Sequence, residues 1–212
     1  VPGVEELCLT TNGSLLPQMA RPLRDAGVRR LNISLDTLRP DRFRAMTRTG
    51  SLQQTLDGIR AAQEAGFPDL KLNTVLIGGF NDGEIGDFLA LTVDHPWEQR
   101  FIELMPMGPC AGWDRTQFLS GEVVLERFPQ LEPLEDQGVA RRYRLPGAKG
   151  VVGLISPLSC AFCARCRRIR VTADGRLKSC LHSQDEIPLK GLPSSGLEAA
   201  IRRGILQKPQ KH

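Results

Sequence analysis

The sequence predicts an α/β fold, a segment of a partial (βα) barrel followed by a cysteine-rich α+β extension. Short apolar strands alternate with amphipathic helices through the first half of the chain, a pattern typical of parallel βα units. A loop rich in glycine and proline, residues 106–117, separates this half from the rest. In the second half, Cys163, Cys166 and Cys180 follow the spacing C-x2-C-x13-C, which is typical of a metal site.

Four strands are expected in the first half, and polar residues follow them at their C-terminal ends. These strands are residues 7–9, 30–35, 70–77 and 100–104. Four units are too few to close an eight-stranded barrel, so they fit a segment of a partial one, in which functional residues lie at the C-terminal strand ends. No glycine-rich dinucleotide motif and no P-loop occurs in the sequence.

Helical periodicity and stop signals place helices between these strands. Ser14 and Asn81 are the expected capping residues. The expected helices are residues 16–26, 40–46, 52–65, 81–93, 121–128 and 197–205. Two further strands, residues 139–144 and 150–155, are expected to pair in antiparallel fashion.

Lys71 is unusual because it lies within an expected strand. Lys71 and Asn73 are two residues apart, so their side chains point to the same face. A lysine on an inner face is costly unless an anion pairs with it. Cys8, inside an apolar strand, is expected to be a core residue.

The segment around the three cysteines reads as a tight turn followed by a hairpin. Cys163 and Cys166 share the turn, and residues 168–172 and 176–181 form the two arms around a turn at residues 173–176. Such a hairpin returns Cys180 to a position beside Cys166.

Two kinds of metal centre fit this arrangement. Zinc would take the three cysteines and His182, with Cys160 able to replace the histidine. An iron–sulfur cluster would take the three cysteines and leave one iron open. The surrounding basic residues favour the second, because arginine suits the phosphate oxygens of a nucleotide. These basic residues are Arg165, Arg167, Arg168, Arg170, Arg176 and Lys178.

Composition limits the classes of function. The net charge of the 212-residue chain is only +4, so the basic patch is local. Aromatic residues make up 5% and none lies among the arginines, which argues against nucleic acid as a partner. We see no membrane span and no signal peptide, and six cysteines without a secretion signal indicate the cytoplasm.

Five segments, in order along the chain, resemble the GTP 3′,8-cyclases, which are radical S-adenosylmethionine lyases of molybdenum cofactor biosynthesis. The segments are LTTNG at residues 9–13, LNISLD at 31–36, KLNTV at 71–75, RFIELMP at 100–106 and ISPLSCAFCARCRRIRVTADGRLKSCL at 155–181. The last is very specific, and the first four are individually weak but jointly strong.

The resemblance implies a six-stranded partial TIM-like (βα) barrel, of which residues 1–105 hold the last four strands, and a C-terminal extension at residues 106–212. Cys163, Cys166 and Cys180 would hold a [4Fe-4S] cluster whose open iron binds the guanine of GTP. The matching GTP-binding positions are Thr10, Lys71, Arg100, Arg168, Ile169 and Arg170. Ser34 and Met105 match positions that hold S-adenosylmethionine, and no residue is assigned as a catalytic acid or base.

The resemblance also implies a reaction, the conversion of GTP to (8S)-3′,8-cyclo-7,8-dihydroguanosine 5′-triphosphate. Cyclic pyranopterin monophosphate synthase would act next. S-adenosylmethionine and a second [4Fe-4S] cluster belong to the full-length parent, whose N-terminal C-x3-C-x2-C motif is not in this sequence. We therefore expect this chain alone to be inactive.

Three alternatives stay open on the sequence alone. One is a zinc hairpin that binds nucleic acid, and another is a different radical maturase with an auxiliary cluster, acting on a peptide. The third open point is the assembly. The sequence does not fix the oligomeric state, and a homodimer is compatible with it.

Overall fold

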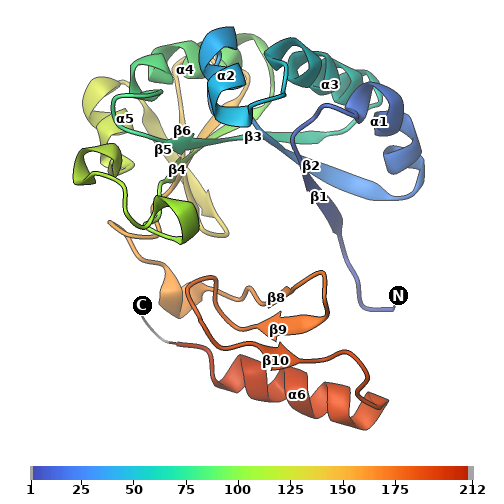
Figure 1. Ribbon diagram of the computed structural model, residues 1–212. Coiled ribbons are helices and arrows are strands. Elements are labelled where there is room, and N and C mark those ends of the chain that lie inside the picture. The colour runs from blue at the N-terminus through green and yellow to red at the C-terminus, as the bar shows by residue number, and fades with distance from the viewer. Residues whose placement is uncertain (1, 210–212) are drawn as a thin grey trace. The chain divides into compact units, whose positions relative to one another are not determined.

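The computed structural model describes residues 2–209, apart from the side chain of Arg165. The chain forms two compact units, Val1–Ser159 (unit 1) and Cys160–His212 (unit 2), which we describe separately. Unit 1 contains a large sheet and five α-helices, whereas unit 2 contains a small sheet and one α-helix (Figure 1). In the described part of the chain, no helix is both long and apolar enough to cross a membrane.

Unit 1 is organised around a seven-stranded sheet with the order β1-β2-β3-β4-β7-β6-β5. Strands β1 to β4 and β7 are mutually parallel neighbours, and the β5–β6 hairpin completes the sheet with antiparallel pairing. The strands are β1 (Leu7–Thr11), β2 (Val28–Ser34), β3 (Asp69–Leu76), β4 (Glu98–Glu103), β5 (Glu132–Gln137), β6 (Ala140–Arg144) and β7 (Val151–Ile155). The predicted α/β class, with a mainly parallel central sheet, is therefore confirmed.

Helices α1 to α4 lie on one face of this sheet (Figure 1). The helices of unit 1 are α1 (Leu16–Asp25), α2 (Pro40–Thr47), α3 (Leu52–Glu64), α4 (Ile85–Asp94) and α5 (Glu122–Arg127). Alternate strand residues face the helices and are fully buried, among them Leu31, Ile33, Leu72, Phe101 and Leu154. Because strand side chains alternate, the residues between these point to the opposite face of the sheet.

Both expected capping residues have other roles. Helix α1 begins without a side-chain cap, and the Ser14 hydroxyl hydrogen-bonds the Asn12 side chain instead. Asn81 is buried; its amide oxygen accepts from the Ile77 N–H (2.8 Å), and its amide nitrogen donates to the Val75 carbonyl (2.8 Å). These backbone groups lie where β3 ends, and buried backbone groups need partners. The Asn81 side chain therefore bonds these backbone groups and does not cap the following helix.

The second half of the chain contributes more to the sheet than the sequence predicts. The expected antiparallel pair is confirmed as β6 and β7, but β7 also pairs in parallel with β4. Strand β5 was not expected, because its sequence, EPLEDQ, is polar and mostly exposed. We expected the organisation to change after residue 105, whereas the compact units divide after Ser159, because residues 132–155 extend the sheet.

Unit 2 contains the predicted hairpin, with shorter strands than expected. Strands β8 (Arg170–Val171) and β9 (Arg176–Lys178) pair in antiparallel fashion, and β10 (Ile187–Pro188) adds to β9. The turn contains Gly175 at a φ of +83°, which glycine adopts without strain. Helix α6 (Ser194–Leu206) buries Ala200 in a small core with Leu177 and Leu189.

Gly58 controls how closely α3 approaches the loop before α1. A methyl group at Gly58 would overlap the carbonyl oxygen of Gly13 and lie 2.9 Å from its carbonyl carbon. We expect Gly58→Ala to lower the free energy of unfolding by about 2 kcal/mol, as overpacking does. Urea denaturation would measure this. Gly83→Ala is the matched control, since Gly83 is exposed with open space around it. Equal unfolding midpoints for the two variants would contradict the prediction.

Candidate functional site

The sheet face opposite α1 to α4 is polar, and we call it the polar face of unit 1. Strand pairing arranges its residues in two adjacent rows. The first row is Thr10, Asn32, Lys71 and Glu98. The second row is Ser34, Asn73, Arg100, Gly153 and Arg142. Thr10, Ser34, Lys71 and Arg100, which the sequence analysis selected one by one, thus share one face and neighbouring rows.

A single carboxylate links the two cations of this face. Glu98 Oε2 lies 2.8 Å from Lys71 Nζ, and Glu98 Oε1 lies 2.6 Å from Arg100 Nε. The three side chains are 4–13% exposed, so the group is buried and carries one excess positive charge. The anion that an inward lysine requires is thus present as Glu98. The sequence did not single out Glu98, although it is only two residues before Arg100, because the register of β3 against β4 is not readable from the sequence.

The pKa values of Lys71 and Glu98 are both lowered, but for different reasons. Burial lowers the pKa of Lys71, and the hydrogen bond to Glu98 only partly restores it. For Glu98, burial raises the pKa, but the charges and hydrogen bonds of Arg100 and Lys71 outweigh burial and hold the pKa below its ordinary value of 4.5. At neutral pH, Glu98 is therefore an anion between two cations.

The neighbours of this group leave room for it. A methyl group at Gly153 would lie 3.0 Å from Glu98 Oε1 and 3.1 Å from Arg100 Cγ, closer than ordinary contacts. Glycine at this position therefore allows the ion pair to form against β7. From the β5–β6 hairpin, Gln137 Oε1 accepts a hydrogen bond from Lys71 Nζ at 3.2 Å.

Cys8 lies on the polar face and not in the core. Its thiol is half-buried, and Arg30 Nη2 lies 2.9 Å from Cys8 Sγ. Arg30 also pairs with Glu6 at 2.7 Å. The core assignment was wrong because β1 is an edge strand whose apolar residues alternate with this partly solvated face.

The C-terminal end of β4 is fixed by a buried carboxylate. Glu103 is 2% exposed and accepts backbone N–H groups of Gly121 (2.9 Å), Leu158 (3.0 Å) and Ser159 (3.1 Å). Burial raises the pKa of Glu103, but these hydrogen bonds outweigh it and lower the pKa. Glu103 thereby holds two loops at the end of β4, two residues before the half-buried Met105.

Asp36 is a second carboxyl at a strand end of the polar face. It lies two residues beyond Ser34, and its Oδ1 accepts the Val75 N–H at 2.8 Å. Burial raises its pKa, and the hydrogen bond from Val75 offsets this only partly. The carboxyl is thus easier to protonate than an ordinary aspartate.

The candidate metal ligands all belong to unit 2. Cys163 begins a 3-10 turn (Cys163–Arg165), Cys166 follows it, and Cys180 follows β9. Arg170 pairs with Lys178, so continuing this register by two residues places Cys180 opposite Arg168, two residues from Cys166. All three cysteines are half-buried, while Cys160 is exposed.

Cys166 has an environment suited to a thiolate. Lys208 Nζ lies 3.3 Å from Cys166 Sγ and 2.6 Å from the Arg168 carbonyl oxygen. Burial raises the pKa of Cys166, but the backbone N–H of Arg168 and the Lys208 ammonium outweigh it and lower the pKa. The thiolate is the form that binds metal. Within residues 2–209, no group of three or more His, Cys, Asp or Glu side chains is placed to hold a single metal ion.

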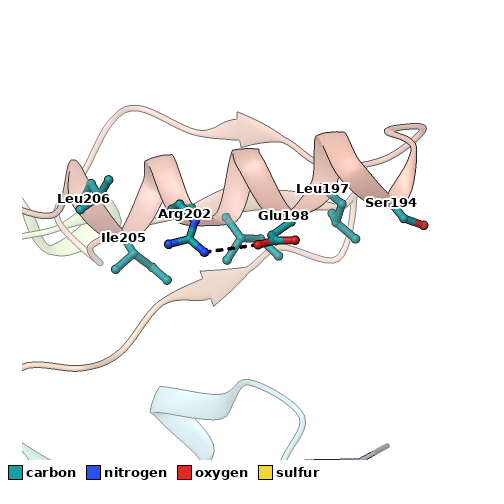
Figure 2. Close-up of a pocket in the computed structure, with 7 residues that line it drawn as sticks. Ser194, Leu197, Glu198, Arg202, Ile205 and Leu206 are labelled. Carbon is teal, nitrogen blue, oxygen red and sulfur yellow. Dashed lines mark hydrogen bonds and ion pairs between the residues drawn. The ribbon is translucent and has the colours of Figure 1, made fainter.

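A cavity of about 520 Å³ lies along α6, and it lacks converging polar groups. Figure 2 shows Leu197, Ile205 and Leu206 along the helix, while Glu198 and Arg202 face each other and pair at 3.3 Å. Because its two charges satisfy one another, this groove is not the candidate site.

Comparison with known sequences matches both halves of the chain. Residues 1–92 match the radical SAM superfamily, and residues 97–212 match the family described as Molybdenum Cofactor Synthesis C. The GTP 3′,8-cyclase of Alkaliphilus metalliredigens is 50% identical over the whole chain, which covers 68% of that relative. The corresponding enzymes of Alkaliphilus oremlandii and Geobacter sulfurreducens are 45% and 46% identical, with the same coverage.

The sheet and these matches define a protein of the radical SAM superfamily, whose members use a [4Fe-4S] cluster and S-adenosylmethionine. More narrowly, the chain belongs to the family of GTP 3′,8-cyclases, enzymes of molybdenum cofactor biosynthesis. The family resemblance seen in the sequence is thereby confirmed.

Glu98→Gln should destabilise the protein by about 3 kcal/mol at neutral pH, because two buried cations lose their anion. The pKa of Glu98 is lowered in the folded protein, so its contribution is fully present above pH 4.5 and is lost as pH falls through the folded value. Urea denaturation across this range would measure it. Glu135→Gln, on exposed β5, is the control. A difference between wild type and Glu98→Gln that does not shrink on acidification would contradict this account.

Proposed function

We propose that this protein binds GTP and acts in its conversion to (8S)-3′,8-cyclo-7,8-dihydroguanosine 5′-triphosphate. The observation that carries the proposal is the buried excess of positive charge around Glu98. Family membership supports GTP as the substrate, because the relatives are named for it. A buried cationic group gains most from a polyanion such as a triphosphate.

Within unit 1, we propose that Lys71 and Arg100 bind the triphosphate. Both are held in place by Glu98, and Thr10 offers a hydroxyl in the row of Lys71. Preorganised donors of this kind lower the entropic cost of binding a flexible chain of phosphates. Ser34, at the end of β2, and Met105, just beyond β4, are the proposed contacts to S-adenosylmethionine.

Within unit 2, we propose that Cys163, Cys166 and Cys180 hold a [4Fe-4S] cluster. The donor set fits this group, since it consists of three half-buried thiols, one of which has a lowered pKa. When bound, the cluster would supply an open, Lewis-acidic iron for a guanine nitrogen or oxygen. Arg168, Ile169 and Arg170 begin the hairpin beside Cys166, and we propose that they contact GTP.

The proposal also covers the second cluster, the roles of the two halves of the chain, the next enzyme, the location and the assembly. A second [4Fe-4S] cluster would accompany S-adenosylmethionine, as the superfamily requires. Residues 1–105 would act as the barrel part and residues 106–212 as the extension with the auxiliary cluster. Cyclic pyranopterin monophosphate synthase would consume the product. We also propose a cytoplasmic location, in keeping with a chain of six cysteines of which a cluster would use three, and leave a homodimer as the arrangement to test.

Anaerobic reconstitution tests the metal assignment. We expect about four irons and four sulfides per chain for one cluster. Cys163→Ser should lower both markedly, whereas the neighbouring Cys160→Ser should not. One zinc per chain without sulfide would instead support the zinc alternative, with His182 as a ligand.

Calorimetry with the reconstituted chain tests the nucleotide. We expect GTP to bind, and Lys71→Met to weaken GTP by about tenfold or more while leaving guanosine binding unchanged, since a charge-assisted contact is removed. Lys149→Met is the control, because Lys149 is exposed and its ammonium group donates to the backbone carbonyl of Asp94. Failure of the wild-type chain to bind GTP would contradict the proposed function.

A further inference from the structure

Arg142 is a third cation of the polar face, and neither the sequence nor the family resemblance assigns it a role. It lies on β6, directly across Gly153 from Arg100 in the second row. Because Gly153 has no side chain, nothing stands between the two positions on β7. Arg142 is half-buried and makes no ion pair with any residue in the described range.

The hydrogen bonding of Arg142 is incomplete. Its Nε is buried and has no hydrogen-bond partner among the described residues. Leaving a buried donor of a charged group unpaired is costly, more so than for a neutral donor. Native proteins rarely keep such a group without a reason, and a ligand that accepts hydrogen bonds would remove the cost.

A cavity of about 120 Å³ is lined by Lys71, Trp97, Glu98 and Arg142, at the N-terminal ends of β3, β4 and β7. Trp97 is 8% exposed, and its indole N–H is also buried without a partner in this part of the chain. Two unpaired donors and a lysine thus surround one small space. At about 30 Å³ per water in the liquid, the space suits a phosphate group better than a base or a sugar.

The acidic residues that line this cavity do not neutralise its positive charge. Both oxygens of Glu98 are already engaged, one by Lys71 and one by Arg100. Asp69 also lines the cavity, but it is exposed to solvent, where its charge is screened. Buried Lys71 and half-buried Arg142 therefore line the cavity with only one buried anion, Glu98, and that anion is shared with Arg100.

We infer that Arg142 is a further nucleotide-binding residue, which with Lys71 holds the terminal phosphate of the triphosphate in this cavity. The inference rests on the proposed function and adds a specificity to it. A nucleoside triphosphate reaches Arg142, whereas a nucleoside monophosphate, lacking the outer phosphates, does not. Arg142 therefore contributes to the preference for triphosphate over monophosphate.

The test compares GTP and GMP binding by calorimetry, with the reconstituted full chain and its Arg142→Met variant. We expect GTP to bind about tenfold more weakly to the variant and GMP to bind equally to both proteins. Unchanged GMP binding also shows that the variant is folded. Arg144→Met is the matched control, since it removes the same charge from an exposed position two residues along β6, and it should leave both affinities within about twofold.

The outcomes separate this inference from the proposed function. If wild type binds GTP and Arg142→Met binds GTP equally well, the inference fails and the proposed function stands. If GTP and GMP weaken together, Arg142 has only a structural role and the inference again fails. If wild type binds no GTP, both fail. Arg142→Lys, which keeps the charge, should recover part of the GTP affinity.

Discussion

The polar face of unit 1 depends on one carboxylate. Glu98 is buried between Lys71 and Arg100, and each cation would be costly in that place without it. The pairing joins β3 to β4 through side chains as well as through backbone hydrogen bonds. It also fixes the direction of both cations. A face with buried charges can therefore exist on a sheet whose other face packs against an apolar core.

The two faces of the sheet meet different physical requirements. Leu72 and Phe101 face the helices and are stabilised by leaving water. Lys71 and Arg100, one residue away from each, leave water only because a partner compensates their charge. In unit 2 the requirement is different again, because a short hairpin has little core to support it. Three strands and one helix supply the small core around Leu177.

The sequence predicts best those features that depend on local periodicity. Strands β1 to β4, helices α1 to α6 and the cysteine hairpin follow from apolar spacing and turn residues. It also predicts that Lys71 needs an anion, but not that the anion is Glu98, because pairing between parallel strands is set by the whole sheet. Strand β5 has no apolar alternation and gains its structure from pairing with β6. Asn81 does not cap a helix, because its side chain instead hydrogen-bonds backbone groups at the end of β3. The roles of Thr10, Ser34 and Met105 came from resemblance alone.

The ion pairs of Glu98 also bear on how quickly a ligand would leave the proposed site. In the proposed site, a phosphate that engages Lys71 and Arg100 would share them with the carboxylate that already pairs with both. Glu98 would thus compete with the phosphate for these two cations. When a phosphate left, the cations would pair with Glu98 again, without salt from the solvent to neutralise them. An internal counter-ion of this kind limits affinity and favours rapid exchange, so the residue that stabilises the two cations would also help to release a bound phosphate.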